Sequence, residues 1–386
     1  MVQLPHTEDF SSPVHDTKVV ARVGIWLGVA FTICFLTGLV SHLHQHPLAW
    51  LPFPATPEWG YRVTQGLHVA AGTASVPLLL AKLYAVYPRL FRRPVLGTVG
   101  QQLRRASVAV LVAAAVLQVF TGVANVAQWY VFGFGFTAVH YAVAWVVVGA
   151  LLVHVAVFLP GISRALGEGL STADEERLAV EEAGSARGRR WFLGSALGVA
   201  AGAVALTVGQ TVPALEPLAL LARRHPSRSP SGIPVNRTAA QAGITASTVA
   251  AVPGRWRLRL SGPGGERQLS YADLATLPQT EVELPITCVE GWSASGRWAG
   301  VRVRDLVALA GGSARSFVGV ESLERRGPYR RTTLPTAHAQ HPDTLLALRL
   351  NGAALSVDHG YPARLIAPNR PGVLQTKWVS AMVVSA

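Results

Sequence analysis

Two kinds of side chain in this sequence could hold a redox cofactor: a cysteine in a tight loop and histidines within apolar segments. Cys288, one of only two cysteines, stands in the stretch ITCVEGWSASGRWAG at 286–300. The residues before it, 281–287, read as a strand that delivers Cys288 to a turn, and a Gly/Ser-rich loop with two tryptophans follows. A thiolate on such a loop is a soft metal ligand or a nucleophile. A buried structural cysteine is the alternative.

Three histidines, His68, His140 and His154, lie inside long apolar segments. A histidine within a membrane is costly unless it has a polar partner or a metal. His68 and His140 each lie about two turns from the predicted outer end of their segments, so the two imidazoles are expected at one depth. One histidine from each of two helices at one depth is an arrangement that holds a b-type haem through two axial imidazoles. A structural polar contact is the alternative.

The spacing along the later segment bears on the number of haems. His140 and His154 are 14 residues apart, which leaves them about 40° apart on one helix face and ~21 Å apart in depth. This spacing resembles that of membrane dihaem cytochromes b. Lys82, however, stands 14 residues after His68, where the fourth ligand should be. We therefore expect one haem b, on the outer side, rather than two, with His154 either a ligand to an unidentified partner or a hydrogen-bonding group.

The composition points to membrane spans, because half of the 386 residues are hydrophobic and only 14% are charged. Five apolar stretches are long enough to cross a bilayer, at 20–42, 63–87, 104–128, 137–159 and 191–212. Basic residues gather on alternate connections between the spans, whereas the two opposite loops hold only Arg62. The gathered residues are Lys18, Arg22, Arg89, Arg92, Arg93, Arg104, Arg105, Arg164, Arg177, Arg187, Arg189 and Arg190. This asymmetry predicts a cytoplasmic N-terminus in the inner membrane and an extracytoplasmic location for everything after the fifth span.

Two further explanations are excluded by the pattern of residues. The formal net charge of +13 comes with no nucleic-acid-binding motif, so nucleic acid is not expected as a partner. Cys34 lies inside an apolar segment, far in sequence from Cys288, so a disulfide framework is not expected and redox chemistry requires a cofactor.

The junction before the fifth span, GRRWFLG at 188–194, resembles a twin-arginine export signal. A pair of positive anchors on an ordinary span is the alternative. No convincing cleavage site follows, so we expect the span to remain as an anchor and the twin-arginine translocase to be a partner. Residues 213–235 are rich in Pro, Ser and Arg and are expected to form a tether.

The segment around Cys288, with CVEGWS followed by W-x-G, resembles the molybdenum-binding loop of the sulfite oxidase superfamily. Later motifs follow in that family's order, at Asp343–Leu350, Asn351–Gly352, Asp358–Leu365, Pro368–Gly372 and Lys377–Trp378. The resemblance covers about residues 236–386 and implies a mixed α+β domain. It also implies that a molybdopterin cofactor is bound.

The resemblance assigns roles to individual residues of this sequence. It implies that Cys288 ligates molybdenum beside the pterin dithiolene, and that Arg364 and Lys377 bind the pterin and its phosphate. His359 stands at another pterin-contacting position. The less secure matches are Asn236, Arg237 and Ser322 for the pterin, and Tyr329, Arg330, Trp292 and His338 on the open side of the metal. A surface residue or a cap is the alternative for each.

The sequence departs from the sulfite-oxidising members of the superfamily. Those proteins follow their cysteine with a basic stretch, whereas Cys288 is followed by Val289 and the acidic Glu290. Sulfite is therefore not expected as the substrate. The loop is closer to the periplasmic methionine sulfoxide reductase branch, which receives electrons from a haem-bearing membrane partner.

These observations predict a fused electron-transfer oxidoreductase with an all-α five-span bundle and a sulfite-oxidase-type domain. The quinone pool would exchange electrons with haem b, and the molybdenum site would transfer an oxygen atom on a small substrate, preferably reducing an S-oxide or N-oxide. The alternatives are a non-catalytic pterin-binding module on a haem-free anchor, and an enzyme whose membrane half is only an anchor. The expected boundaries are a cytochrome-b-like domain at 1–160, a cytoplasmic loop at 161–190, the fifth span at 191–212, the linker at 213–235 and the molybdopterin domain at 236–386.

Overall fold

The computed structural model describes residues 10, 12–48, 50–91, 97–167, 179–245 and 256–386. Three of the basic residues used above for orientation, Arg92, Arg93 and Arg177, lie outside these ranges. The chain forms two compact units. The helical unit comprises Met1–Gly38, Leu67–Val208 and Leu218–Arg223, and the sheet unit comprises Leu39–Gly66, Gly209–Pro217 and Arg224–Ala386.

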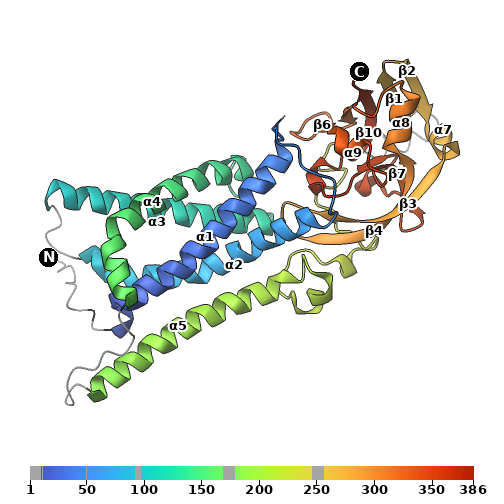
Figure 1. Ribbon diagram of the computed structural model, residues 1–386. Helices are drawn as coiled ribbons and strands as arrows, with labels where there is room; N and C mark the ends of the chain where they lie inside the picture. The colour runs from blue at the N-terminus through green and yellow to red at the C-terminus, as the bar shows by residue number, and fades with distance from the viewer. Residues whose placement is uncertain (1–9, 11, 49, 92–96, 168–178, 246–255) are drawn as a thin grey trace. The chain divides into compact units, whose positions relative to one another are not determined.

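Long helices account for most of the first half of the chain (Figure 1). They are α1 (Thr17–Gln45), α2 (Gly60–Val86), α3 (Val99–Ala127), α4 (Phe136–Gly167) and α5 (Ala179–Val208). Within the described residues, five helices are long and apolar enough to cross a membrane, which confirms the predicted multi-pass helical architecture. The loop expected at 161–190 is shorter than predicted, because α4 continues to Gly167 and α5 already begins at Ala179. The Ala- and Glu-rich sequence there favours helix.

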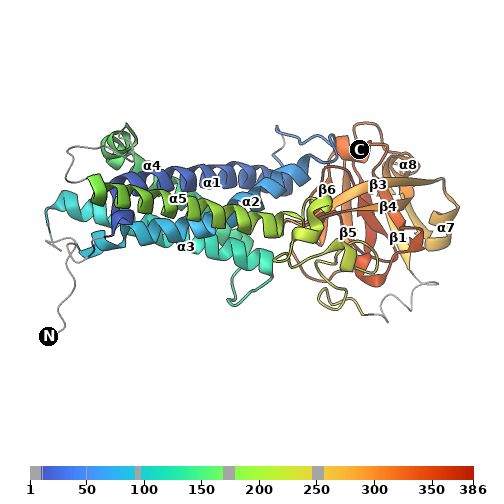
Figure 2. The same cartoon turned by 90° about the horizontal axis from the view of Figure 1, so that it is seen from below.

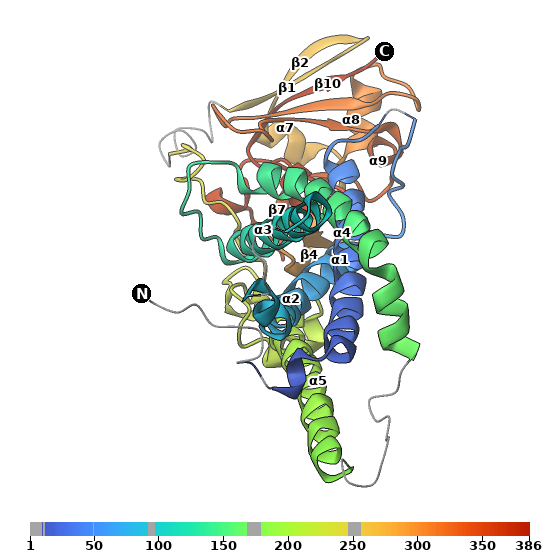
Figure 3. The same cartoon turned by 90° about the vertical axis from the view of Figure 1, so that its left-hand side faces the viewer.

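The helical unit packs through small and branched apolar residues on facing sides. Leu27 of α1, Leu78 of α2, Ala115 of α3 and Ala200 of α5 belong to one buried cluster, and α1 and α2 lie side by side in all three views (Figures 1, 2 and 3). Helix α4 packs on α3. Many large apolar side chains point outward, and Leu152 of α4 is 66% exposed. Such a surface is suited to lipid.

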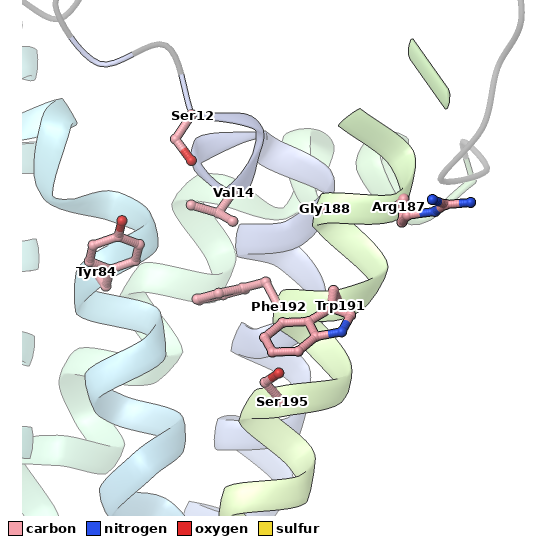
Figure 4. A pocket seen from close by; sticks show the side chains of 8 residues that line it. All are labelled: Ser12, Val14, Tyr84, Arg187, Gly188, Trp191, Phe192 and Ser195. Carbon is pink, nitrogen blue, oxygen red and sulfur yellow. The ribbon is translucent and has the colours of Figure 1, made fainter. Parts of the chain in front are cut away.

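The twin-arginine-like residues are helical and lie within α5 (Figure 4). Trp191 and Phe192 line a hollow together with Tyr84 of α2 and Ser12 and Val14 near the start of α1. Phe192 turns toward Tyr84, with 6.0 Å between the ring centroids. These contacts do not test recognition by a translocase, which stays a prediction.

The sheet unit contains two five-stranded sheets. One has the order β2-β1-β10-β5-β6, from β1 (Arg257–Gly262), β2 (Gly265–Ser270), β5 (Val318–Ser322), β6 (Arg331–Leu334) and β10 (Val379–Val384). The other is β3 (Gln279–Thr287), β4 (Ser293–Arg302), β7 (Leu345–Leu350) and β8 (Ala353–Ala354), with β9 (Arg364–Ile366) on β7. Short helices α7 (Tyr271–Thr276), α8 (Val303–Leu309) and α9 (Thr336–Ala339) connect them. The predicted mixed α+β class is confirmed.

Strand β7 separates two hydrophobic cores. Leu346 and Leu348 belong to the core that both sheets and α8 share, while Leu345 and Ala347 belong to a second core. Successive side chains of a strand point to opposite faces, so the LLALRL sequence is apolar on both. The second core contains Cys288, and β7 therefore helps to fix the surroundings of the thiol.

The Gly/Ser-rich stretch after Cys288 is not a loop, as expected, but strand β4. It pairs with β3 from Thr287↔Ser293 to Gln279↔Val301. Buried Ala294 and Trp298 alternate with exposed Ser295 and Arg297, which is the period of a strand. Small residues suit this strand because β7 lies close. A Cβ at Gly300 would overlap the backbone of Leu346 and Ala347.

The expected tether at 213–235 is partly a packed segment. Ile233 is fully buried in the second core, and the Ser231 hydroxyl contacts a histidine of the sheet unit. The Pro- and Ser-rich composition suggested a flexible chain, but a single large apolar side chain is enough to bring the end of the segment into the core.

Replacing Gly300 with Ala should destabilise the sheet unit, because the added Cβ would force β4 away from β7. Overpacking of this kind costs about 3 kcal/mol, which corresponds to a thermal midpoint lower by roughly 5–10 °C in the detergent-extracted protein. Gly319→Ala in β5 is the matched control, since its Cβ would meet Val383 at an ordinary 3.7 Å. Equal midpoints for the two variants would contradict this packing argument.

Candidate functional site

Cys288 stands where strand β3 ends and a tight turn begins. Its amide donates to the Trp292 carbonyl at 2.9 Å, and the Gly291 amide donates to the Cys288 carbonyl at 3.0 Å. Gly291 has a φ of +96°, a conformation that glycine adopts without strain. We call residues 288–292 the Cys288 loop. The loop joins β3 to β4 and places the thiol in the second core.

The thiol is only 1% exposed. Burial raises the pKa of Cys288 well above its ordinary value, and the charge of Glu290 raises it further. A thiol in this environment is a poor free nucleophile, but a metal ion would deprotonate it outright. Among the described residues, no three His, Cys, Asp or Glu side chains gather as a metal site. A metal at Cys288 would therefore take its other ligands from a bound cofactor.

Two cationic side chains lie in the same unit without a carboxylate partner. Arg364 is 4% exposed, its Nη1 donates to the His359 carbonyl at 3.3 Å, and its Nε has no hydrogen-bond partner. The ammonium of Lys377 donates to the carbonyls of Arg237 at 2.6 Å and Asp358 at 2.9 Å. None of the ion pairs among the described residues includes Arg364 or Lys377.

The cost of burying these cations appears in their pKa values. Burial lowers the pKa of Arg364 to about 9. Burial and the charge of Arg364 lower the pKa of Lys377 to about 7. Burial and the charges of Arg364 and Lys377 lower the pKa of His359 to about 4. A bound anion would reverse each shift, because an opposite charge favours the protonated form. The residues present thus fit a phosphate-bearing pterin, whose oxygens would accept charge-assisted hydrogen bonds.

The less secure pterin-binding predictions gather around Lys377. Arg237 gives its carbonyl to the ammonium and pairs with Glu324 at 2.7 Å. The Ser322 hydroxyl donates to the Lys377 carbonyl at 2.8 Å. Asn236 accepts from the Arg237 amide at 3.0 Å. In this structure these three residues support Lys377 and its surroundings, and contact with the pterin stays a prediction.

The residues predicted on the open side of the metal divide into two groups. Burial raises the pKa of Tyr329, and the charge of Cys288 raises it further. His338 is 3% exposed and neither ring nitrogen has a hydrogen-bond partner. Arg330 is partly exposed and donates to the Arg325 carbonyl at 3.3 Å. No interaction with the thiol supports Arg330.

In the helical unit, His68 and His140 come together as predicted. Their ring centroids are 6.1 Å apart with the planes at 78°. His68 Nδ1 lies 2.9 Å from the Cys34 carbonyl. His140 Nδ1 lies 3.0 Å from Thr121 Oγ1, and His140 Nε2 lies 3.0 Å from Gln118 Nε2. His154 instead packs against Phe158, with 4.7 Å between the ring centroids and the planes tilted by 39°, and its Nδ1 has no hydrogen-bond partner.

This pair fits a metal held between two imidazoles, with one condition. Two rings that bind opposite sides of one metal at ~2 Å per bond have centroids about 6 Å apart. Glycines flank both rings, because a Cβ at Gly38 would come 3.0 Å from His68 and one at Gly122 would come 3.2 Å from His140. The condition is that Gln118 must release His140 Nε2. The Lys82 ammonium donates to the Val20 carbonyl at 2.6 Å.

Several residues of the site were not predicted from the sequence. Arg370 is 6% exposed and donates to the Thr333 carbonyl at 2.8 Å, and its charge acts on His338. Ser231 lies 2.6 Å from His359 Nε2. Gln65 donates to the Val289 carbonyl at 2.7 Å. The sequence pattern around Arg370, Ser231 and Gln65 has no period that would predict these contacts.

Lys377 should make the stability of the cofactor-free protein depend on pH. Because its folded pKa is about 7 and its ordinary value is 10.5, the unfolded chain binds the extra proton between these values, and stability should rise with pH across this window. Lys377→Met should flatten the rise in a thermal-midpoint series. The cofactor-loaded protein should also lack it, because the phosphate would keep the ammonium charged. Identical slopes in all three samples would contradict the assignment.

Comparison with known proteins connects this site to a family. Residues 245–386 match the family described as oxidoreductase molybdopterin binding domain. The chain is 31% identical over 163 residues to the mitochondrial sulfite oxidase of Rattus norvegicus, covering 35% of this chain and 30% of that protein. It is 32% identical over 132 residues to a protein of Azospira oryzae named as a protein-methionine-sulfoxide reductase subunit, YedZ1, covering 34% and 49%.

The chain thus spans between about a third and a half of these relatives. Among solved structures, the sulfane dehydrogenase SoxCD from Paracoccus pantotrophus aligns with 24% identity and a TM-score of 0.32, over 34% of this chain and 39% of that one. The family match contains Cys288, Arg364 and Lys377. Residues 245–386 of this chain thus match the molybdopterin-binding domain of oxidoreductases and are similar to sulfite oxidase.

Proposed function

We propose that this chain is a membrane-bound oxidoreductase that connects a quinone pool, through haem b, to a molybdenum site outside the membrane. One observation carries the proposal. A fully buried thiol lies in the same unit as two cations, Arg364 and Lys377, and neither cation forms an ion pair with a carboxylate among the described residues. An anionic, metal-bearing cofactor would satisfy all three groups at once.

The residues of this chain would bind and orient the cofactor. Cys288 would supply one thiolate to molybdenum, and Arg364, Lys377 and His359 would hold the pterin and its phosphate. Asn236, Arg237 and Ser322 would contribute through Lys377. The cofactor, when bound, supplies two-electron oxygen-atom chemistry, while the protein provides ligation, orientation and electrostatics.

Reduction of a neutral S-oxide or N-oxide is the favoured reaction. Glu290 is 7% exposed, its charge acts on the Cys288 thiol, and it accepts a hydrogen bond from Trp292 at 3.1 Å. Arg224 lies 3.9 Å from the Glu290 carboxylate and offsets part of its charge, but a carboxylate beside the metal ligand still disfavours an anion such as sulfite. The balanced reaction takes two electrons and two protons, breaks the S–O or N–O bond and releases water. Quinol is the chemical class of the reductant.

The haem would lie between His68 and His140, with His154 outside it. Their 6.1 Å centroid separation and the flanking glycines support one such group. Quinol oxidation would deliver electrons to this haem one at a time. The inner-membrane location, the cytoplasmic N-terminus and export by the twin-arginine translocase follow from the basic-residue pattern and complete the proposal.

A non-catalytic pterin-binding module is the second candidate. The helical unit would then be a haem-free anchor, and the hydrogen bonds of His140 to Gln118 and Thr121 would be purely structural. This candidate predicts protein without molybdenum and without a haem spectrum.

Metal analysis and a reduced-minus-oxidised spectrum of the extracted full chain would separate these functions. Cys288→Ser should lose molybdenum and keep haem, because only the thiolate ligand is removed. His68→Ala should lose the haem b signal and keep molybdenum. Cys34→Ser and His154→Ala are the matched controls and should keep both cofactors. Molybdenum without haem in the wild type would reduce the helical unit to an anchor.

Activity should follow the cofactors. Protein with stoichiometric molybdenum should reduce a small sulfoxide or N-oxide with dithionite as the electron donor. The rate of Cys288→Ser should be lower by a factor of at least about a hundred, since removal of a key group typically costs this much. Sulfite should not be oxidised at a comparable rate. A loaded enzyme that oxidises sulfite and reduces no oxide would overturn the assigned direction and substrate class.

A further inference from the structure

We propose that the outer ends of α1 and α2, and the residues that follow α5, complete the molybdenum site by holding the Cys288 loop and Tyr329 in place. These segments, 39–66 and 209–217, are part of the sheet unit and lie outside the family match at 245–386. The inference rests on the proposed function, because it assigns positioning residues to that site. It predicts that residues 39–66 and 209–217, outside the matched family domain, are structural components of the active site.

The backbone of the Cys288 loop is anchored by side chains and carbonyls from these segments. Gln65 Nε2 donates to the Val289 carbonyl at 2.7 Å, and the Thr211 hydroxyl donates to the Gly291 carbonyl at 2.5 Å. The Ser293 amide, directly after the loop, donates to the Gln210 carbonyl at 2.8 Å. Buried backbone groups are costly without partners. The matched family domain by itself does not supply these three partners.

A continuous hydrogen-bond chain connects this anchor to Tyr329. The Tyr329 hydroxyl donates to Gln45 Oε1 at 2.8 Å, and Gln45 Nε2 lies 3.4 Å from Ser41 Oγ. Ser41 and Tyr61 share a hydrogen bond of 2.8 Å between their hydroxyls. The Tyr61 hydroxyl lies 3.4 Å from Gln65 Oε1, and Gln65 then reaches the loop.

The inner members of this chain are buried. Tyr61 is 1% exposed, Gln65 is 3% exposed and Ser41 is 8% exposed. Polar groups at such positions are normally hydrogen-bonded, and removal of one partner leaves the other with an unmet desolvation cost. Gln65 uses its amide nitrogen toward the loop and its oxygen toward Tyr61. The position of the Val289 carbonyl is therefore linked to the orientation of Tyr329.

This arrangement defines positioning residues. Val289 is the neighbour of Cys288, so the anchor at its carbonyl limits how the sulfur can move. The charge of Cys288 acts on Tyr329, and Gln45 sets the direction of the Tyr329 hydroxyl. The two helix ends thus fix both the metal ligand and a side chain on the substrate side. A hydrogen-bond network of this kind fixes geometry when all its members are satisfied.

The test uses the full chain with Gln65→Met, Tyr61→Phe and Thr64→Ala. Gln65→Met keeps the length of the side chain but removes the donor to Val289, and Tyr61→Phe removes only the hydroxyl. Thr64→Ala is the control on the same helical turn, since that hydroxyl bonds only to the carbonyls of Gly60 and Tyr61 in its own helix. Molybdenum content, the Mo(V) electron paramagnetic resonance signal and the molybdenum midpoint potential are measured for each.

The expected result is that all three variants retain molybdenum, while Gln65→Met and Tyr61→Phe alone show an altered Mo(V) signal and a shifted potential. Their kcat should fall about tenfold, as expected for one lost hydrogen bond that positions the reacting groups, with a smaller change in KM. Loaded Gln65→Met and Tyr61→Phe variants with the wild-type signal and potential would overturn the inference.

A second measurement does not depend on molybdenum. In a Cys34→Ser background Cys288 is the only cysteine, and its alkylation by a small maleimide is followed in protein from cells that make no pterin. Gln65→Met and Tyr61→Phe should be alkylated several times faster than the parent, whereas Thr64→Ala should match it. Equal rates in all four proteins would contradict the anchoring role. Wild-type protein without molybdenum would refute the proposed function, and the alkylation rates would still decide this inference.

Discussion

The organisation of the sheet unit depends on buried positive charge. Arg364 is buried, Lys377 is partly buried, and both donate only to carbonyl oxygens among the described residues. The charges of Asp358 and Glu324 act on Lys377 without forming an ion pair with it. In most proteins, buried cations are paired with carboxylates, because the desolvation cost of an unpaired charge reaches several kcal/mol. None of the ion pairs among the described residues includes Arg364 or Lys377, so an anionic ligand would stabilise both charges. Burial also raises the pKa of the Cys288 thiol, and a bound metal would deprotonate it.

The rest of the fold supplies the positions of these groups. Strand β3 delivers Cys288, β9 begins at Arg364 and β10 begins just after Lys377. Strand β7 contacts both β4 and β9, so the cysteine hairpin and the arginine strand share one support. Trp298 on β4 lies under the guanidinium of Arg364 at 5.5 Å, a cation–π contact. A substitution on β7 would thus affect the positions of both Cys288 and Arg364.

Local patterns in the sequence were sufficient for some elements and not for others. The five spans and the strand before Cys288 could be predicted, because each has the period and length of its element. Strand β4 could not, because its glycine and serine residues are typical of loops in isolation and form a strand only where β3 and β7 flank them. The approach of His68 to His140 followed from equal depth. Ser231, Arg370 and Gln65 could not be found, because their partners are distant in the chain.

The helix ends show why the membrane part and the molybdopterin domain are better considered together. Residues 39–66 contain the last turns of α1 and the first two turns of α2, and they belong to the sheet unit. Tyr61 offers its amide to the side chain of Asn369 at 2.7 Å, and Asn369 donates in turn to the Pro54 carbonyl at 2.8 Å. These bonds use the backbone amide of Tyr61, whereas its hydroxyl faces Gln65. The segment that contains Asn369 also contains the buried Arg370. A substitution in the first two spans could therefore change the molybdenum site without touching a residue of the family domain.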